Sequence, residues 1–194
     1  VPALNDFARL YPQIDLDVSF THRMVNLVDE GFDAAIRAGR VTDSAMIARK
    51  LCDMHTIIVA SPAYLAQHPA PSHPTDLARH ACIIDTNFRD PLQWRFATPE
   101  GPLAVALRGR LRYSNAEACL RAAEMGLGIA NVPDFVAALS LKSGLTEALL
   151  TPFAEDFGGI YVLYPPGRHL AAKVRVLVDF LADRYRDRPD WALL

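Results

Sequence analysis

The chain has 194 residues, of which 51% are hydrophobic and 22% are charged. This composition excludes a disordered chain, a collagen and a coiled coil, and no apolar run approaches the roughly 18 to 20 residues that a membrane-spanning helix needs. The 20 Lys and Arg residues against 22 Asp and Glu residues give a formal net charge of -2. These residues therefore have no electrostatic reason to bind a polyanion such as nucleic acid.

The N-terminus and the cysteines give two further expectations. The sequence starts at Val1 without a Met, a charged n-region or an apolar h-region, so we expect a fragment rather than a natural translation start or a secretory signal. Cys52, Cys82 and Cys119 are odd in number and form no CxxC, and we expect three reduced core thiols of a cytoplasmic protein. A redox-sensing thiol and a metal site that starts from Cys52 and His55 are the alternatives, although no second ligand pair accompanies these two residues.

The first forty residues alternate between helical and strand patterns. Apolar residues recur at helical spacing from Pro2 to Tyr11 and predict a short amphipathic helix. Residues 14–20 alternate apolar and polar side chains, which predicts a strand with one buried face. A helix capped by Thr21 and a strand over 33–38 that ends at Gly39 follow. This alternation favours parallel strands joined by crossover helices.

The rest of the chain also mixes strands and helices. We expect a strand over 56–60 and then a rigid, proline-rich passage over 61–74 around one short helix. The later elements are expected as strands over 81–85, 93–98, 103–112, 127–132, 145–150 and 159–164, and as helices over 114–126, 134–142 and 170–186. The last helix has an apolar stripe and a charged face, which is typical of an outer helix packed on a sheet.

Two groups of residues resemble catalytic or nucleotide-binding motifs only in part. Gly126 and Gly128 match a piece of a dinucleotide fingerprint, but a helix precedes them, a strand follows, and Asn131 occupies the third glycine position. We therefore expect the two glycines to end a helix and to allow close packing. Asp85 and Asp90 are a potential pair of catalytic carboxylates, and we expect both in a solvated surface loop.

The start of the helix at 114–126 is a candidate ligand site. Ser114 begins a capping-box pattern that Glu117 completes, and this alone explains the residue types. The helix start also follows a strand, and ligands settle at the carboxyl ends of strands in open α/β sheets. Free amides at a helix start favour an anion. Ser114 and Asn115 are therefore candidate ligand contacts, with a purely structural cap as the alternative.

Other strand ends offer similar groups. Thr21 and His22, Gly39, and Pro133 each follow a predicted strand, and together they would line one crevice if the strands share a direction. Arg37 is a positive charge inside the largely apolar strand predicted over 33–38. It is either paired with a neighbouring carboxylate or directed into a polar cleft.

Four stretches of sequence are similar to one known family and together cover nearly the whole chain. The combination of VDEGFDAAIRAG with ASPAYL about twenty residues after it is the most specific part. The stretches are FARLYPQIDLDVSFTHRMVNLVDEGFDAAIRAG (7–39), IARKLCDMHTIIVASPAYLAQHPAP (47–71), NAEACLRAAEMGLGIANVPDF (115–135) and YPPGRHLAAKVRVLVDFL (164–181). On these residues the chain resembles the effector-binding domain of LysR-type transcriptional regulators.

The resemblance implies an α/β fold of two Rossmann-like lobes joined by two crossover strands, as in the type 2 periplasmic binding proteins. Lobe I would comprise residues 1–59 and 160–194, and lobe II would comprise residues 60–159. No enzymatic activity, cofactor or metal is implied.

The resemblance also implies a regulatory function. A small-molecule effector, such as a carboxylate, would bind between the lobes and control DNA binding by the full-length protein. Two of the family's effector contacts match this sequence, at Thr21 and at the pair Ser114 and Asn115.

The partners implied are a homodimer or homotetramer, in which the first helix packs antiparallel beside the second lobe of another subunit, and DNA, which is reached only through an N-terminal helix-turn-helix that these residues lack. No membrane partner is implied. One alternative is a stand-alone solute-binding protein with the same fold. The other is a small-molecule enzyme built on the same lobes, against which stands the lack of a nucleophile with a neighbouring base in this sequence.

Overall fold

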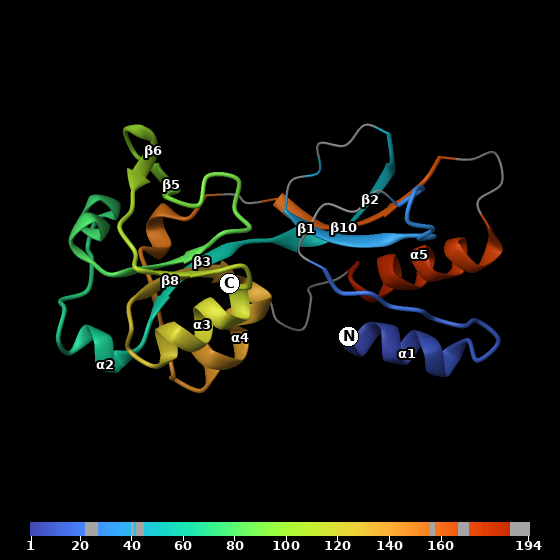
Figure 1. The fold of residues 1–194 in the computed structure, drawn as a ribbon, viewed down its shortest axis with the longest axis horizontal. Helices are drawn as coiled ribbons and strands as arrows, with labels where there is room; N and C mark the ends of the chain where they lie inside the picture. The colour runs from blue at the N-terminus through green and yellow to red at the C-terminus, as the bar shows by residue number, and fades with distance from the viewer. Residues whose placement is uncertain (22–26, 40, 42–44, 156–157, 167–170, 187–194) are drawn as a thin grey trace. The chain divides into compact units, whose positions relative to one another are not determined.

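The computed structural model describes residues 1–21, 27–39, 41, 45–155, 158–166 and 171–186 (Figure 1). The chain divides into two compact units. Unit 1 comprises Val1–Met54 and Gly158–Asp190, and unit 2 has His55–Phe157 as its continuous part. Among the described helices, none combines the length and the hydropathy that crossing a membrane requires.

Unit 1 contains a three-stranded antiparallel sheet. Its strands lie in the order β1 (Ala35–Gly39), β10 (Gly158–Tyr164) and β2 (Ile47–Met54). The prediction that the first strands pair in parallel is therefore wrong for β1, whose partner comes from the far end of the chain. Alternating hydrophobicity specifies an extended segment and its buried face, but it does not specify the partner strand or its direction.

Two helices pack within unit 1, as their amphipathic patterns predict. They are α1 (Pro2–Leu10), which has proline at its first position, and α5 (Ala172–Arg184). Phe7 of α1 is fully buried, and its ring lies 5.4 Å from that of Phe180 in α5. A hydrophobic cluster joins these helices to β2 and β10; its buried members are Ala3, Leu51, Val162, Val174, Val178 and Leu181.

The strand predicted over residues 14–20 is not formed. These residues have no helix or strand, and the side chains of Val18 and Phe20 are 43% and 76% exposed. A single extended segment gains no ladder hydrogen bonds without a neighbour, so its alternating pattern is insufficient to make it a strand. Most of the helix predicted after Thr21 falls on residues 22–26, which lie outside the described residues.

Unit 2 is built on a mixed five-stranded sheet. Strand β4 runs parallel to both β7 and β8, while β3 runs antiparallel to β8 and β9. The strands lie in the order β7 (Leu111–Tyr113), β4 (Cys82–Asp85), β8 (Ile129–Pro133), β3 (Thr56–Ala60) and β9 (Glu147–Leu149).

The unit 2 sheet has a hydrophobic cluster on each face. Side chains alternate between faces along a strand, so Ile57 and Val59 belong to one cluster and Ile58 belongs to the other. Helices α3 (Ala116–Glu124) and α4 (Asp134–Lys142) cover the face of Ile57. The other face packs against the hairpin of β5 (Gln93–Thr98) and β6 (Gly101–Ala106), on the opposite side of the sheet in Figure 1.

Unit 2 also contains short helices. They are α2 (Pro62–Leu65), which the sequence predicted within the proline-rich passage, and the 3-10 helices η1 (Pro74–Arg79) and η2 (Thr151–Phe153). The single strand predicted over 103–112 is wrong, because β6 and β7 belong to different sheets. The break contains Gly109, where an added Cβ would lie 2.0 Å from the carbonyl oxygen of Cys82.

The two glycines after α3 act as predicted. Gly126 adopts φ +77° directly after the helix, which is a glycine stop. Gly128 adopts φ +150°, and a Cβ there would lie 2.3 Å from the backbone oxygen of Ala81. Both residues therefore have a structural explanation that requires no phosphate.

Candidate functional site

Three strands of unit 2 end at the same edge of its sheet. Because β7, β4 and β8 are parallel, their last residues Tyr113, Asp85 and Pro133 lie along one carboxyl edge. Adjacent strands are about 4.8 Å apart, so the ends of β7 and β8 are separated by about 10 Å across β4. The structure thereby brings the candidates Ser114 and Asn115, which follow β7, to the same edge as Pro133.

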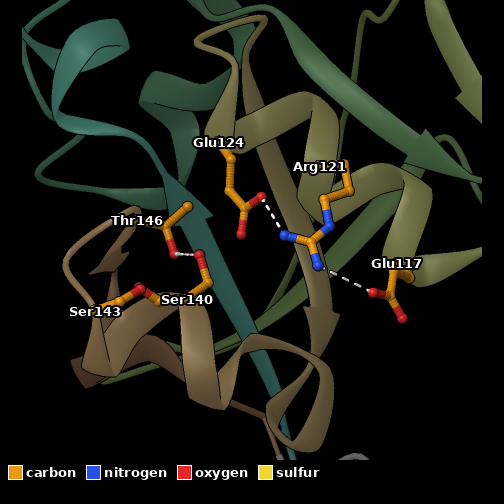
Figure 2. Close-up of polar contacts among 6 residues, drawn as sticks. All are labelled: Glu117, Arg121, Glu124, Ser140, Ser143 and Thr146. Carbon is orange, nitrogen blue, oxygen red and sulfur yellow. Dashed lines mark hydrogen bonds and ion pairs between the residues drawn. The ribbon is translucent and has the colours of Figure 1, made fainter.

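The N-terminus of α3 lies at this edge, but its cap differs from the predicted one. Asn115 is the capping residue, and its Oδ1 accepts a hydrogen bond of 2.9 Å from the backbone N–H of Ala118. The predicted capping box from Ser114 is therefore wrong. Glu117 does not fold back toward the helix start, since its Oε1 lies 3.3 Å from Arg121, which also contacts Glu124 at 2.9 Å (Figure 2).

Because Asn115 rather than Ser114 caps α3, the two candidate residues differ in the groups that are available to a ligand. Ser114 is exposed and is not needed as the cap, so its hydroxyl can contact a bound molecule. Asn115 is half-buried, and its carbonyl oxygen already serves the helix. The first-turn amides and the positive end of the helix dipole make this edge favourable for an anion.

Asp85 at the end of β4 is buried, so its assignment to a solvated loop is wrong. Only 5% of the residue is exposed, and its Oδ1 accepts a 2.9 Å hydrogen bond from the backbone N–H of Asn87. Asp90 does lie on the surface, 3.5 Å from Arg95. A buried carboxylate at the carboxyl edge is a polar feature that sequence analysis missed, and its position directly after three buried apolar residues of β4 was the available signal.

Pro133 is the residue before α4, and the next residue, Asp134, is a buried aspartate. Asp134 accepts hydrogen bonds from the backbone N–H groups of His55, at 3.3 Å, and Phe135, at 2.7 Å. Burial raises the pKa of Asp134, and these two amides oppose that shift. The carboxylate is therefore committed to joining the start of α4 to the start of β3.

The remaining candidates belong to unit 1. Arg37 is half-buried in β1 opposite Tyr161 of β10, and Gly39 ends the same strand with φ +109°. Thr21 is exposed and lies in a stretch without regular secondary structure. His22 is outside the described residues.

A small pocket lies wholly within unit 2, on the sheet face away from α3 and α4. Its cavity volume is about 40 Å³, and it contains the side chain of Asn131 from β8, opposite Ile58 of β3. Asn131 is 9% exposed, and its buried Oδ1 accepts no hydrogen bond from any residue that the structure describes. The pocket is lined by Thr56, Ile57, Ile58, Arg95, Phe96, Asn131, Leu149, Leu150, Thr151, Ala154 and Glu155.

The sequence alone does not reveal this pocket, because its residues come from four separate segments. The available signal was the single amide of Asn131 within the otherwise apolar strand 129–133. A buried polar group without a partner is rare in native structures and requires a specific explanation.

All three cysteines are free thiols. Cys82 and Cys119 are buried, and burial raises the pKa of each to about 12; the nearby charge of Asp85 contributes to the shift at Cys119. In the described ranges, no group of three or more His, Cys, Asp or Glu side chains is arranged to hold a metal ion. The buried thiols thus lack the low pKa that a reactive cysteine requires.

The profile of the family described as the LysR substrate binding domain matches residues 1–186. The chain belongs to this family. It is 33% identical over 183 residues to the HTH-type transcriptional regulator PtxR of Pseudomonas aeruginosa, covering 94% of the chain and 59% of PtxR. It is 32% identical over 194 residues to the HTH-type transcriptional regulator DmlR of Escherichia coli, covering 99% of the chain and 63% of DmlR.

Solved structures of LysR-type regulators have the same fold. The full-length virulence activator AphB of Vibrio cholerae superimposes with a TM-score of 0.83 at 30% identity, covering 95% of this chain and 62% of AphB. The regulatory domain of CrgA from Neisseria meningitidis gives a TM-score of 0.82 at 28% identity, covering 95% of this chain and 90% of that domain. This chain therefore has the α/β fold of these regulatory domains. That fold resembles the fold of type 2 periplasmic binding proteins.

The family assignment concerns only the part of the relatives that this chain matches. The chain spans about six tenths of the length of PtxR and DmlR. The matched family consists of domains of transcriptional regulators, a class that is not enzymatic.

Proposed function

We propose that this chain is the effector-sensing module of a LysR-type transcriptional regulator, in which a small metabolite such as a carboxylate controls DNA binding by the full-length protein. The observation that carries the proposal is the carboxyl edge of unit 2, where three parallel strands end beside the N-terminus of α3. Such an edge is where open α/β sheets bind ligands, and a helix start favours an anionic group.

The proposal keeps the predicted lobes, with residues 1–59 and 160–194 as lobe I and residues 60–159 as lobe II. The proposed effector contacts are Thr21, His22, Arg37 and Gly39 from lobe I, and Ser114, Asn115 and Pro133 from lobe II. Arg37 is a half-buried residue, and its guanidinium is the group in this set that suits a carboxylate best.

Only part of the binding free energy can operate the switch. A micromolar effector releases about 8 kcal/mol on binding. The part that differs between two arrangements of the lobes, typically about 1 to 3 kcal/mol, shifts the population and thereby the spacing of DNA-binding heads. An effector that bound both arrangements equally would produce no regulation.

Calorimetric titration with a panel of small carboxylic acids tests the proposed site. The Ser114→Ala and Thr21→Ala variants are each expected to weaken binding of the active acid about tenfold, because each loses a hydrogen bond to a charged group. Ser143→Ala, an exposed serine after the C-terminal end of α4, is the matched control and should bind like the unmodified chain. Equal affinity in all four proteins would refute the site assignment.

The proposed partners are further copies of the chain and, through an N-terminal helix-turn-helix, DNA. The relatives are described as HTH-type regulators and are longer than this chain, which supports the second partner. Leu10 of α1 is 61% exposed, which suits a homodimer or homotetramer in which α1 packs against another subunit. Light scattering that finds only monomer at high concentration would contradict this assembly.

A cytoplasmic location follows from the proposed action on DNA, and three free thiols are consistent with it. The regulator names of the relatives favour this function over that of a stand-alone solute-binding protein.

A further inference from the structure

The pocket around Asn131 contains a hydrogen-bond acceptor that the described protein does not use. Oδ1 of Asn131 is buried, and no described residue donates to it. Leaving such an acceptor unpaired costs stability, so an amide at this position is unfavourable unless it binds something. A volume of about 40 Å³ exceeds the roughly 10 to 15 Å³ that one water requires, so the pocket can admit a small polar group.

Two other residues that line the pocket have opposite charges, and two more, Thr56 and Thr151, carry hydroxyl groups. Arg95, on β5, has a side chain that is 62% exposed, and its guanidinium lies 3.5 Å from the carboxylate of Asp90, the one ion-pair partner that it has among the described residues. Glu155 is a half-buried residue and contributes a carboxylate. The lining also includes the buried apolar side chains of Phe96 and Leu150.

The amide of Asn131 and the charged groups of Arg95 and Glu155 define the chemistry of a ligand that would fit this pocket. Two acceptors, the amide oxygen of Asn131 and the carboxylate of Glu155, suit an ammonium group, which has three donors and no acceptor. The guanidinium of Arg95 suits a carboxylate. From this arrangement we infer that the pocket of unit 2 binds the head group of an α-amino acid, with the ammonium directed to Asn131 and the carboxylate to Arg95.

This pocket is distinct from the carboxyl edge described above. It lies on the face of the sheet opposite α3 and α4, and none of Ser114, Asn115 and Pro133 lines it. The inference depends on unit 2 alone. It can therefore fail while the proposed effector site stands, or the reverse.

Nuclear magnetic resonance with glycine as the probe tests the inference in the full 194-residue chain. Glycine is expected to shift the side-chain amide resonances of Asn131 in a saturable way below 100 mM. Glycolate, which has a hydroxyl in place of the ammonium, is expected to bind at least tenfold more weakly, and acetate should bind no better than glycolate. Equal affinities for glycine and acetate, or no saturable shift with glycine, would overturn the inference.

Substitutions then identify the groups that bind, with glycine affinity measured by calorimetry. Asn131→Leu removes the acceptor but keeps the branching of the side chain and should weaken glycine binding at least tenfold, whereas Asn131→Asp keeps an acceptor and should remain within threefold. Arg95→Gln should weaken binding at least fivefold. Asn5→Leu, an exposed amide on α1, is the matched control and should leave the affinity unchanged. Loss of binding in Asn131→Asp with a folded circular dichroism spectrum would show that the amide acts as a donor and would refute the assignment of the ammonium.

Discussion

Units 1 and 2 bury their sheets in different ways. In unit 2, β4 is buried at every residue and β8 at every residue but the last, and clusters lie on both faces. In unit 1, β1 and β2 include exposed residues along their length. A strand with neighbours on both sides and cover on both faces requires a continuous apolar run, whereas a less covered strand tolerates alternation. The comparison shows that burial, rather than strand propensity, distinguishes the two sheets.

The largest expected effect is at the close approach of strands in unit 2. Gly128→Ala should lower the free energy of unfolding by about 3 to 5 kcal/mol, because φ is +150° and the new Cβ would meet the backbone oxygen of Ala81. Urea unfolding followed by circular dichroism measures the change. Gly144→Ala is the control: its φ is +72° with nothing within 4 Å of the added Cβ, so a loss of about 1 to 2 kcal/mol is expected. Equal losses would show that the close approach is unimportant.

A slightly smaller loss is expected in unit 1, where one aromatic side chain joins its two helices. Phe7→Ala should cost about 3 to 4 kcal/mol, since the ring is fully buried and contacts Tyr11 and Phe180. The measurement is again urea unfolding. Phe20→Ala removes a ring that is 76% exposed and should change stability by less than about 0.5 kcal/mol. A cost at Phe20 equal to that at Phe7 would contradict the burial of α1 described here.

The third prediction also concerns the core of unit 2, but here the substitution is expected to stabilise the protein. Asn131→Leu should raise the free energy of unfolding by about 1 to 2 kcal/mol without ligand, because it replaces a buried, unpaired acceptor with an apolar side chain of the same branching. Asn5→Leu on α1 should have no measurable effect. A destabilised Asn131→Leu protein would mean that the amide is already well paired.

The raised pKa of a buried thiol in unit 2 should make the free energy of unfolding depend on pH. The folded state keeps the thiol proton of Cys119 up to a pKa of about 12, while the unfolded chain releases it near the ordinary value of 9.0. The unfolded state therefore binds fewer protons between these pH values, and the contribution of the thiol to stability falls as pH rises through that window. The stability difference between the unmodified chain and Cys119→Ala should shrink from pH 8 to pH 10.5. A constant difference would contradict the raised pKa.

The smallest effect is expected at the surface of unit 1. Nζ of Lys173 lies 2.6 Å from Oδ2 of Asp33, but both side chains are more than half exposed. Asp33→Asn should change the free energy of unfolding by less than about 0.5 kcal/mol at low salt, and by nothing measurable at 1 M NaCl. A larger or salt-independent effect would show that this pair is less solvated than its exposure indicates.

Local sequence patterns predicted most elements where neighbouring residues decide the conformation. The ranges predicted for α4 and β5 agree with the structure, because helical spacing and β-branched or aromatic content are local properties. The single strand expected over 103–112 was wrong because Gly109 approaches Cys82, 27 residues earlier in the chain, and this close approach divides the segment. The capping residue of α3 moved from Ser114 to Asn115 because both types can cap, and backbone geometry selects between them.

The candidate site was predictable only in part. The positions of Ser114, Asn115 and Pro133 after strands follow from the sequence, but their presence at one edge depends on β4 lying between β7 and β8. Asn131, Arg95 and Glu155 are far apart in the chain, and nothing local connects them. The burial of Asp85 likewise depends on neighbours that the sequence does not identify.

The sequence by itself determined the α/β class, the family and the positions of most helices and strands, because these depend on composition, short-range periodicity and motif order. The tertiary structure alone decided that β1 pairs antiparallel with β10, that Asp85 is buried, and that Asn131 shares a pocket with Arg95. The physical reason is that pairing and burial are relations between distant segments, whose free energies depend on which surfaces meet when the chain folds.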